Sequence, residues 1–272
     1  MPKAYYNENS PGAAATLREL IKRGVIAPGD VDERSIEDVL PDELVGYTQC
    51  HFFAGQGIWS YALRLAGWSD DRPIWTGSCP CQPFSAAGQR KGATDERHLW
   101  PAWYWLIQQH KPSVIVGEQV SSKDGIAWFD TVQTDLEAEA YAVGGVDIPA
   151  CSVGAPHRRQ WLYFMANAQL SERRSLDSTR RSIQRKDSLS QREESPGRPA
   201  GGSSDGPVNG FWRDAKWIPF KDNRYRATEP GSFPLAYGAP SHILRLRNHG
   251  NGIVAPLAES FIRACIETLE QI

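Results

Sequence analysis

The 272-residue sequence is poor in cysteine and contains no long apolar segment. Its five cysteines are odd in number and scattered, which argues against a disulfide framework and for a reducing compartment. No stretch approaches the roughly 20 apolar residues that a membrane helix needs, and the first dozen residues lack the apolar segment of a secretory signal. We therefore expect a cytoplasmic globular protein with no membrane partner.

An excess of charge of one sign is also lacking, since the formal net charge is −2. Overall charge therefore does not by itself predict a nucleic-acid partner. Residues 172–198 differ, because arginines outnumber acids there. Such a segment can supply phosphate contacts, since salt confines the field of each charge to about 10 Å. A solvated, disordered loop is the alternative interpretation.

Short β-rich runs alternate with amphipathic helices from residue 1 to about 166, which is typical of an α/β fold with helices on both faces of a parallel sheet. One helix should begin at Pro11, with Ser10 as its cap, and end at Gly24. Hydrophobic periodicity predicts another from about Ala255 to the end of the chain. Strands are predicted at 47–53, 73–77, 113–117, 141–146 and 161–165, with intervening helices around 58–65, 99–107 and 129–136.

The composition changes sharply after residue 166. Ser, Arg, Gly and Pro dominate up to residue 209 without apolar periodicity, so we expect loop or disorder there. Aromatic and basic residues then alternate over 210–225, which suits a small β-rich module that contacts DNA, or half-buried loop aromatics. We predict a main domain of residues 1–166 completed by 241–272, and a separate region over 167–240.

The segment HFFAGQGIWSYAL, residues 51–63, reads as a strand, a glycine turn and a helix. Backbone N–H groups of such a turn, together with the helix N-terminus, can bind an anionic or nucleotide-like ligand. Taken alone, the motif is explained better by a simple tight connection between strand and helix, because glycine turns are common.

The segment GSCPCQPFSAAG, residues 77–88, places Cys81 in a loop after a short buried strand. A cysteine reacts through its thiolate, which a polar, accessible loop favours. A metal site built on Cys79 and Cys81 would lack the second ligand pair that zinc requires, so we predict a nucleophile and no metal.

Glu118 lies at the carboxyl end of a predicted apolar strand, the edge of an α/β sheet that faces ligands. Burial there should raise its pKa, so that it holds a proton near neutrality. A helix-capping or salt-bridged surface carboxylate is the alternative.

Two of these segments, Pro80-Cys81-Gln82 and Glu118-Gln119-Val120, resemble the catalytic motifs of the DNA cytosine-5 methyltransferase family. Residues 53–68, 154–164 and 249–262 resemble its first cofactor motif, its arginine motif and the pair that closes the cofactor pocket. The resemblance covers most of the chain outside residues 167–240. It implies a Rossmann-like S-adenosylmethionine-dependent methyltransferase sheet, with a small, irregular β-containing target recognition region over 167–240.

The resemblance also implies roles. Cys81 would attack carbon 6 of a cytosine rotated out of double-stranded DNA, protonated Glu118 would hold ring N3, and Arg159 would assist electrostatically. Carbon 5 would then receive the methyl group of S-adenosylmethionine without a metal. The residues implied in cofactor binding are Phe53, Gly55, Gly57, Pro80, Leu99 and Asn251.

One departure is that only residues 68–75 separate the first glycine motif from the catalytic loop, where the family has two more cofactor segments. Residues 5–21 and 27–30 resemble the missing segments, as if locally permuted to the N-terminus. Glu8 would then bind the ribose hydroxyls and Asp30 the adenine amino group. Asn9 replaces an apolar residue expected against the adenine, and Trp161 replaces an arginine expected to touch the target base.

Other readings stay open. RNA-acting members of the family share these motifs, so a tRNA substrate is the main alternative, and Trp161 could mark a catalytically impaired DNA-binding relative. A dinucleotide-dependent oxidoreductase is disfavoured, since the turn lacks G-x-G-x-x-G. A compact enzyme of this kind suits a phage or prophage, so we expect a monomer in a bacterial or phage-infected cytoplasm, and a short recognition sequence.

Overall fold

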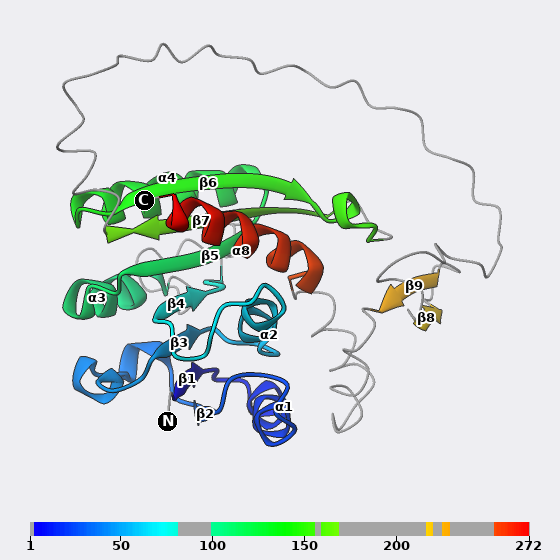
Figure 1. Cartoon of the computed structure of the whole chain (residues 1–272), viewed down its shortest axis with the longest axis horizontal. Coiled ribbons are helices and arrows are strands. Elements are labelled where there is room, and N and C mark those ends of the chain that lie inside the picture. The colour runs from blue at the N-terminus through cyan, green and yellow to red at the C-terminus, as the bar shows by residue number, and fades with distance from the viewer. Residues whose placement is uncertain are drawn as a thin grey trace, which may run out of the picture.

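The computed structural model describes residues 3–80, 99–155, 159–168, 216–219, 225–228 and 253–271. Seven strands form one sheet in the order β2-β1-β3-β4-β5-β7-β6 (Figure 1). The strands are β1 (Ala4–Asn7), β2 (Gly29–Asp32), β3 (Gln49–Phe52), β4 (Ile74–Gly77), β5 (Val114–Val120), β6 (Ala142–Pro149) and β7 (Gln160–Asn167). The helices are α1 (Pro11–Lys22), α2 (Ile58–Leu65), α3 (Trp100–His110), α4 (Lys123–Ala138) and α8 (Ala255–Glu270), with 3-10 turns η1 (Ile36–Asp38), η2 (Pro41–Leu44) and η3 (Ala150–Val153).

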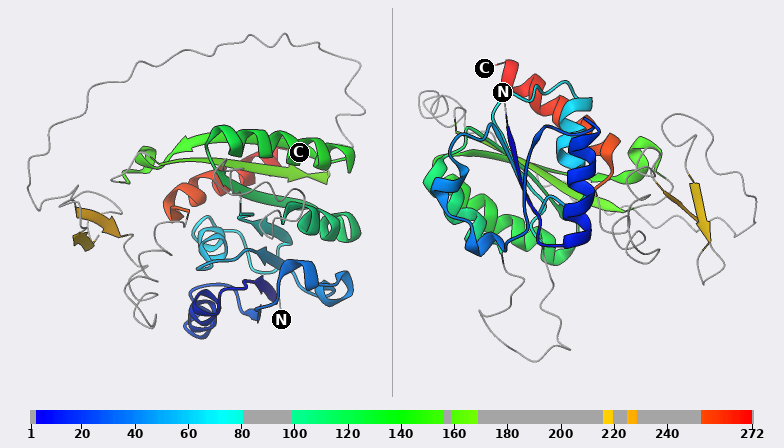
Figure 2. Two further views of the ribbon diagram at one scale, coloured as in Figure 1. Left: turned by 180° about the vertical axis from the view of Figure 1, so that it is seen from behind. Right: turned by 90° about the horizontal axis from the view of Figure 1, so that it is seen from below.

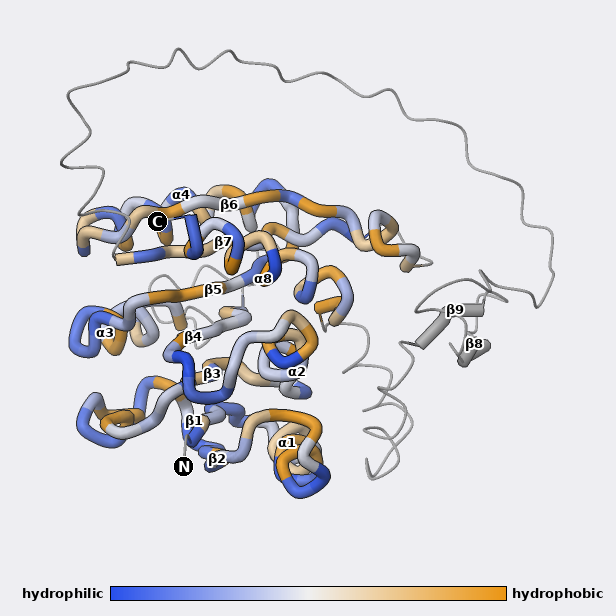
Figure 3. The backbone as a smooth tube through the Cα atoms, viewed as in Figure 1, coloured by the Kyte–Doolittle hydropathy of each residue, from blue (hydrophilic) through white to orange (hydrophobic). Residues whose placement is uncertain are grey.

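Helices cover both faces of the sheet, as the right-hand view of Figure 2 shows. On one face α2 and α8 enclose a core with the inward side chains of β5 and β7, and α1 packs beside them over β1. On the other face α3, α4, η1 and η2 enclose an aromatic-rich core. Hydrophobic and hydrophilic residues alternate along α1 (Figure 3), as a helix covering a sheet requires.

The prediction of a parallel sheet is confirmed for β1 to β5 and is wrong for β7, which pairs antiparallel with both β5 and β6. Parallel neighbours need a crossover connection, usually a helix. Helix α4 provides that crossover from β5 to β6, whereas only η3 and a short loop return the chain from β6. Strand β7 therefore enters between them in the opposite direction.

Local signals placed the first and last helices correctly. Helix α1 has Ser10 as its N-cap and Pro11 as its first residue, and Gly24 follows it with φ of 68°. The Ser10 side chain makes no capping hydrogen bond; its backbone N–H instead donates to Glu8 Oε1 at 2.9 Å. Helix α8 begins at Ala255 as predicted.

Strand β3, which leads into the glycine turn, lies in the middle of the sheet although β1 and β2 precede it in the chain. In the common doubly wound order 3-2-1-4-5-6, the strand before the glycine turn comes first in the chain. Here β3 holds that central place, and β1 and β2 hold the places of the second and third strands. A local permutation would produce this order, and it remains our interpretation of it.

Within residues 167–240, β8 (Lys216–Pro219) and β9 (Tyr225–Thr228) form a two-stranded antiparallel sheet. The arginine-rich segment 172–198 lies outside the described residues. The separation of this region from the main domain and its role in target recognition remain predictions. In the described part of the chain, no helix has the length and apolar character to cross a membrane.

Candidate active site

A cavity of about 700 Å³ opens at the carboxyl ends of β1, β3, β4 and β5. Ligands of open α/β sheets bind at this edge. The residues that line the cavity come from every part of the main domain: Asn7, Glu8, Asn9, Ser10, Ala13, Ile36, Phe53, Ala54, Gly55, Gln56, Ile58, Trp59, Ser78, Cys79, Pro80, Leu99, Glu118, Gln119, Val120, Arg159, Trp161 and Ile253.

The glycine turn between β3 and α2 forms part of the wall. Phe53, Gly55 and Gly57 have φ of 52°, 54° and 72°, a left-handed conformation that favours glycine. Phe53 and Gly55 line the cavity. Gly57 does not; a Cβ there would lie 3.0 Å from Leu17, so this glycine lets the turn pack against α1.

Glu8 follows β1 and ties two parts of the cavity wall together. Its carboxylate accepts hydrogen bonds from the backbone N–H of Ser10, at 2.9 Å, and of Gly55, at 2.7 Å. A carboxylate has about four lone-pair sites, so Glu8 keeps acceptor capacity for hydroxyl groups of a ligand.

The structure does not bring Asp30 to the cavity. Asp30 pairs with Tyr5, two residues before the carboxyl end of β2, and its carboxylate binds Lys3 Nζ at 2.5 Å and the Tyr47 hydroxyl at 2.6 Å. Hydrogen bonds from Lys3 and Tyr47 hold its pKa below the usual range. Ile36, which the sequence analysis did not single out, lines the cavity after β2.

Glu118 is the one titratable group of β5 and is almost entirely buried, with 6% of its surface exposed. Burial raises its pKa to about 7, and a hydrogen bond from Ser78 opposes that rise. Its Oε2 atom has no hydrogen-bond partner in the part of the chain that the structure describes. Glu118 can therefore hold a proton near neutrality, as its place at a strand end predicted.

The residues after β4 are anchored to β5 and α2. Gln119 Nε2 donates to the Cys79 carbonyl oxygen at 3.0 Å, and Trp59 Nε1 donates to Ser78 Oγ at 3.1 Å. Pro80 lines the cavity. Cys81 lies outside the described residues, directly after this anchored segment.

Glycines precede both Ser78 and Glu118, and the reason is steric. Gly77 and Gly117 are register partners in β4 and β5. A Cβ on Gly77 would lie 2.3 Å from the Trp103 ring, and one on Gly117 would lie 2.3 Å from the Phe164 ring. The pairing of Gly77 with Gly117 joins the two strand ends, so the residues that follow enter the cavity side by side.

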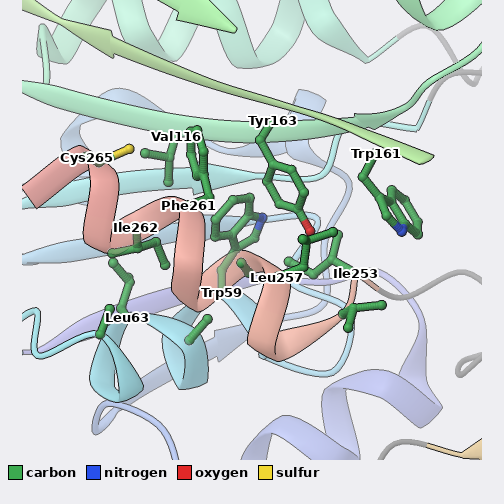
Figure 4. Close-up of a cluster of buried hydrophobic side chains, with 14 of the residues drawn as sticks. Trp59, Leu63, Val116, Trp161, Tyr163, Ile253, Leu257, Phe261, Ile262 and Cys265 are labelled. Atoms are coloured by element: carbon green, nitrogen blue, oxygen red, sulfur yellow. The ribbon is translucent and has the colours of Figure 1, made fainter. Parts of the chain in front are cut away.

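Strand β7 and the segment before α8 close the cavity. Arg159 is exposed, Trp161 is 2% exposed, and both line the cavity, with Arg159 Cζ 5.9 Å from the Trp161 ring centroid. Trp161 and Ile253 lie at the same end of the buried cluster (Figure 4). The predicted residue Leu99 also lines the cavity, whereas Asn251 lies outside the described residues. Ile253 carries no chemical signal in the sequence.

Among the residues that the structure describes, no group of three or more His, Cys, Asp and Glu side chains is arranged to hold a metal ion. The polar groups of the cavity wall are two carboxyl groups, one guanidinium, the Cys79 thiol, and amide, hydroxyl and indole groups. This set suits hydrogen bonding to a nucleoside-like ligand and proton transfer by Glu118.

Residues 69–198 match the family model of the C-5 cytosine-specific DNA methylase. The chain is 30% identical over 92 residues to the Type II methyltransferase M.AplI of Arthrospira platensis. The aligned residues cover 33% of this chain and 27% of that protein. It is 32% identical over 94 residues to the Type II methyltransferase M.AgeI of Thalassovita gelatinovora, covering 33% and 22%. These matches thus span about a quarter of each relative.

A solved structure of a putative DNA modification methyltransferase encoded within an E. coli prophage matches with a TM-score of 0.38 and 15% identity, covering 63% of this chain and 48% of that one.

Proposed function

We propose that this chain is a C-5 cytosine-specific DNA methylase, the family whose model matches residues 69–198, and that it transfers a methyl group from S-adenosylmethionine to carbon 5 of cytosine in double-stranded DNA. One observation carries the proposal. A single cavity is lined both by the Glu8–Gly55 wall and by the buried acid Glu118, next to the anchored segment that leads to Cys81. Cofactor and target base can therefore meet in one place.

The residues present fit S-adenosylmethionine. The cavity of about 700 Å³ lies within the range of roughly 300–1,000 Å³ typical of small-molecule sites. Glu8 would accept hydrogen bonds from the ribose hydroxyls, and Phe53, Gly55, Pro80 and Leu99 would line the rest of the cofactor site. When bound, S-adenosylmethionine supplies an electrophilic methyl group.

The side chains of this protein would prepare the cytosine ring to accept that group. The Cys81 thiolate would form a bond to ring carbon 6, which breaks aromaticity and moves an electron pair towards N3. The Glu118 proton would neutralise the charge at N3, and Arg159 would stabilise the ring electrostatically. Once carbon 5 carries the methyl group, its proton passes to water and the bond to Cys81 breaks, while N3 returns its proton to Glu118; the ring, the thiolate and the acid are thereby restored.

A base stacked in a duplex cannot reach a buried carboxyl group, so the target cytosine must rotate out of the helix at a cost of a few kcal/mol. Phosphate contacts must offset that cost. We assign this role and target recognition to residues 167–240, which include the β8–β9 sheet. Because the region is short and polar, we expect a short recognition sequence; a long site found by bisulfite sequencing of methylated plasmids would contradict this.

The test is transfer of labelled methyl from S-adenosylmethionine to unmodified duplex DNA and, in parallel, to tRNA. The wild-type protein should label DNA, whereas Cys81→Ser and Glu118→Gln should not, although both should bind the cofactor in calorimetry. Label on tRNA alone would move the proposal to an RNA substrate. Cofactor binding without transfer to either nucleic acid would overturn the proposed activity.

A further inference from the structure

We propose that Ser78, held by Trp59, is a positioning residue that keeps the acid proton of Glu118 on the carboxyl oxygen turned away from Ser78. The inference rests on the proposed function, because it specifies which oxygen of Glu118 carries the proton that the acid offers to the cytosine ring. The three residues come from three places in the fold: Trp59 from the first turn of α2, Ser78 from the position directly after β4, and Glu118 from β5.

Backbone register brings these residues together. Gly77 and Gly117 are direct partners across β4 and β5, so Ser78 and Glu118 are the next residues of two neighbouring strands. Trp59 Nε1 lies 3.1 Å from Ser78 Oγ, and Trp59 is only 4% exposed. All three side chains line the same cavity.

The chemistry of the donors sets the direction of the hydrogen bonds. An indole N–H can only donate, so Ser78 Oγ accepts from Trp59. A hydroxyl that accepts one bond still has its own hydrogen to donate, and the neighbouring acceptor is the carboxyl group of Glu118. The hydrogen bond from Ser78 lowers the Glu118 pKa, which is the effect of donation to a carboxylate oxygen.

Because Trp59 donates to Ser78 and Ser78 donates to Glu118, only one carboxyl oxygen of Glu118 can carry the acid proton. The Glu118 oxygen that accepts from Ser78 cannot also present a proton to it, so the neutral acid carries its proton on the other oxygen. That oxygen is then available to a ring nitrogen in the cavity. Without Ser78 this hydrogen bond no longer distinguishes the two oxygens, and the carboxylate loses a hydrogen bond that opposes the rise of its pKa.

The experiment measures the ionisation of Glu118 directly in the full chain without substrate. Infrared difference spectra, assigned with Glu118→Gln, follow the protonated carboxyl band as pH rises. Ser78→Ala and Trp59→Phe should move the midpoint to higher pH, and Ser78→Thr, which keeps the hydroxyl, should restore it. Trp68→Phe is the matched control, because Trp68 also donates its indole N–H, to the Arg72 carbonyl at 3.0 Å, but does not line the cavity.

Methyl transfer provides the second readout. Ser78→Ala and Trp59→Phe should lower kcat about tenfold, the loss expected for one hydrogen bond, with the KM for DNA unchanged. Midpoints equal to wild type in both variants would overturn the inference. If the midpoint shifts in the two variants but the wild-type protein transfers no methyl group, the proposed function is refuted and the inferred order of hydrogen bonds stands.

Discussion

The buried carboxyl group of Glu118 should make the fold less stable as pH rises, which is opposite to the effect of a salt-bridged carboxylate. Its pKa is raised from 4.5 to about 7 by burial. Between these values the unfolded chain has released the proton that the folded chain still holds, so raising the pH favours unfolding. The raised pKa corresponds to about 3 kcal/mol of stability lost by pH 7, with no further loss above it.

Glu118→Gln removes this titration while keeping the shape of the side chain. We expect the difference in unfolding free energy between the variant and wild type to shift by about 3 kcal/mol in favour of the variant from pH 4.5 to pH 8. Urea unfolding at both pH values measures it. Glu267→Gln, at an exposed position of α8, controls for the loss of a carboxylate and should track wild type. A Glu118→Gln difference that stays constant across this range would refute the reasoning.

Three further predictions concern packing, the cofactor wall and a buried histidine. Gly117→Ala should lower the unfolding free energy in urea by about 1–3 kcal/mol, because its Cβ would overlap an aromatic ring, whereas Gly144→Ala, which meets nothing within 4 Å, should not. Glu8→Gln should weaken S-adenosylmethionine binding in calorimetry at least tenfold, and Asp30→Asn should leave it unchanged, contrary to the sequence-based role of Asp30. Burial lowers the pKa of His51 to about 3, so the contribution of His51 to stability should fall as pH drops below about 6.5, by about 2 kcal/mol at pH 5, and in urea unfolding the difference between His51→Gln and wild type should shift by that amount in favour of the variant.

Much of the fold could be predicted because it rests on local patterns. Apolar periodicity located α1 and α8, and Glu118 was recognised from its place at the end of an apolar strand. Position in a strand also decides where Asp30 lies. The sequence does not reveal the register of β2 against β1, and that register sets Asp30 two residues short of the edge that faces the cavity.

Other parts of the site had no signal in the sequence. Ile36 and Ile253 line the cavity as ordinary apolar side chains, and only tertiary packing brings them there. The hydrogen bond from Trp59 to Ser78 joins residues of different elements, so no local pattern reports it. The antiparallel direction of β7 depends on the short connection from β6, and apolar content alone does not specify it.

The pH dependence of the wild-type protein combines two buried groups that act in opposite directions. His51, whose Nδ1 lies 2.8 Å from Thr76 Oγ1 and whose ring stacks on Tyr6, binds a proton only when the chain unfolds, so its contribution rises with pH up to about 6.5. The contribution of Glu118 falls from pH 4.5 to about 7. Each group changes one proton on unfolding, so over their common range, from about pH 4.5 to 6.5, the two slopes cancel. A nearly flat wild-type profile there, a rising one in Glu118→Gln and a falling one in His51→Gln would together establish that both groups are buried in their neutral forms.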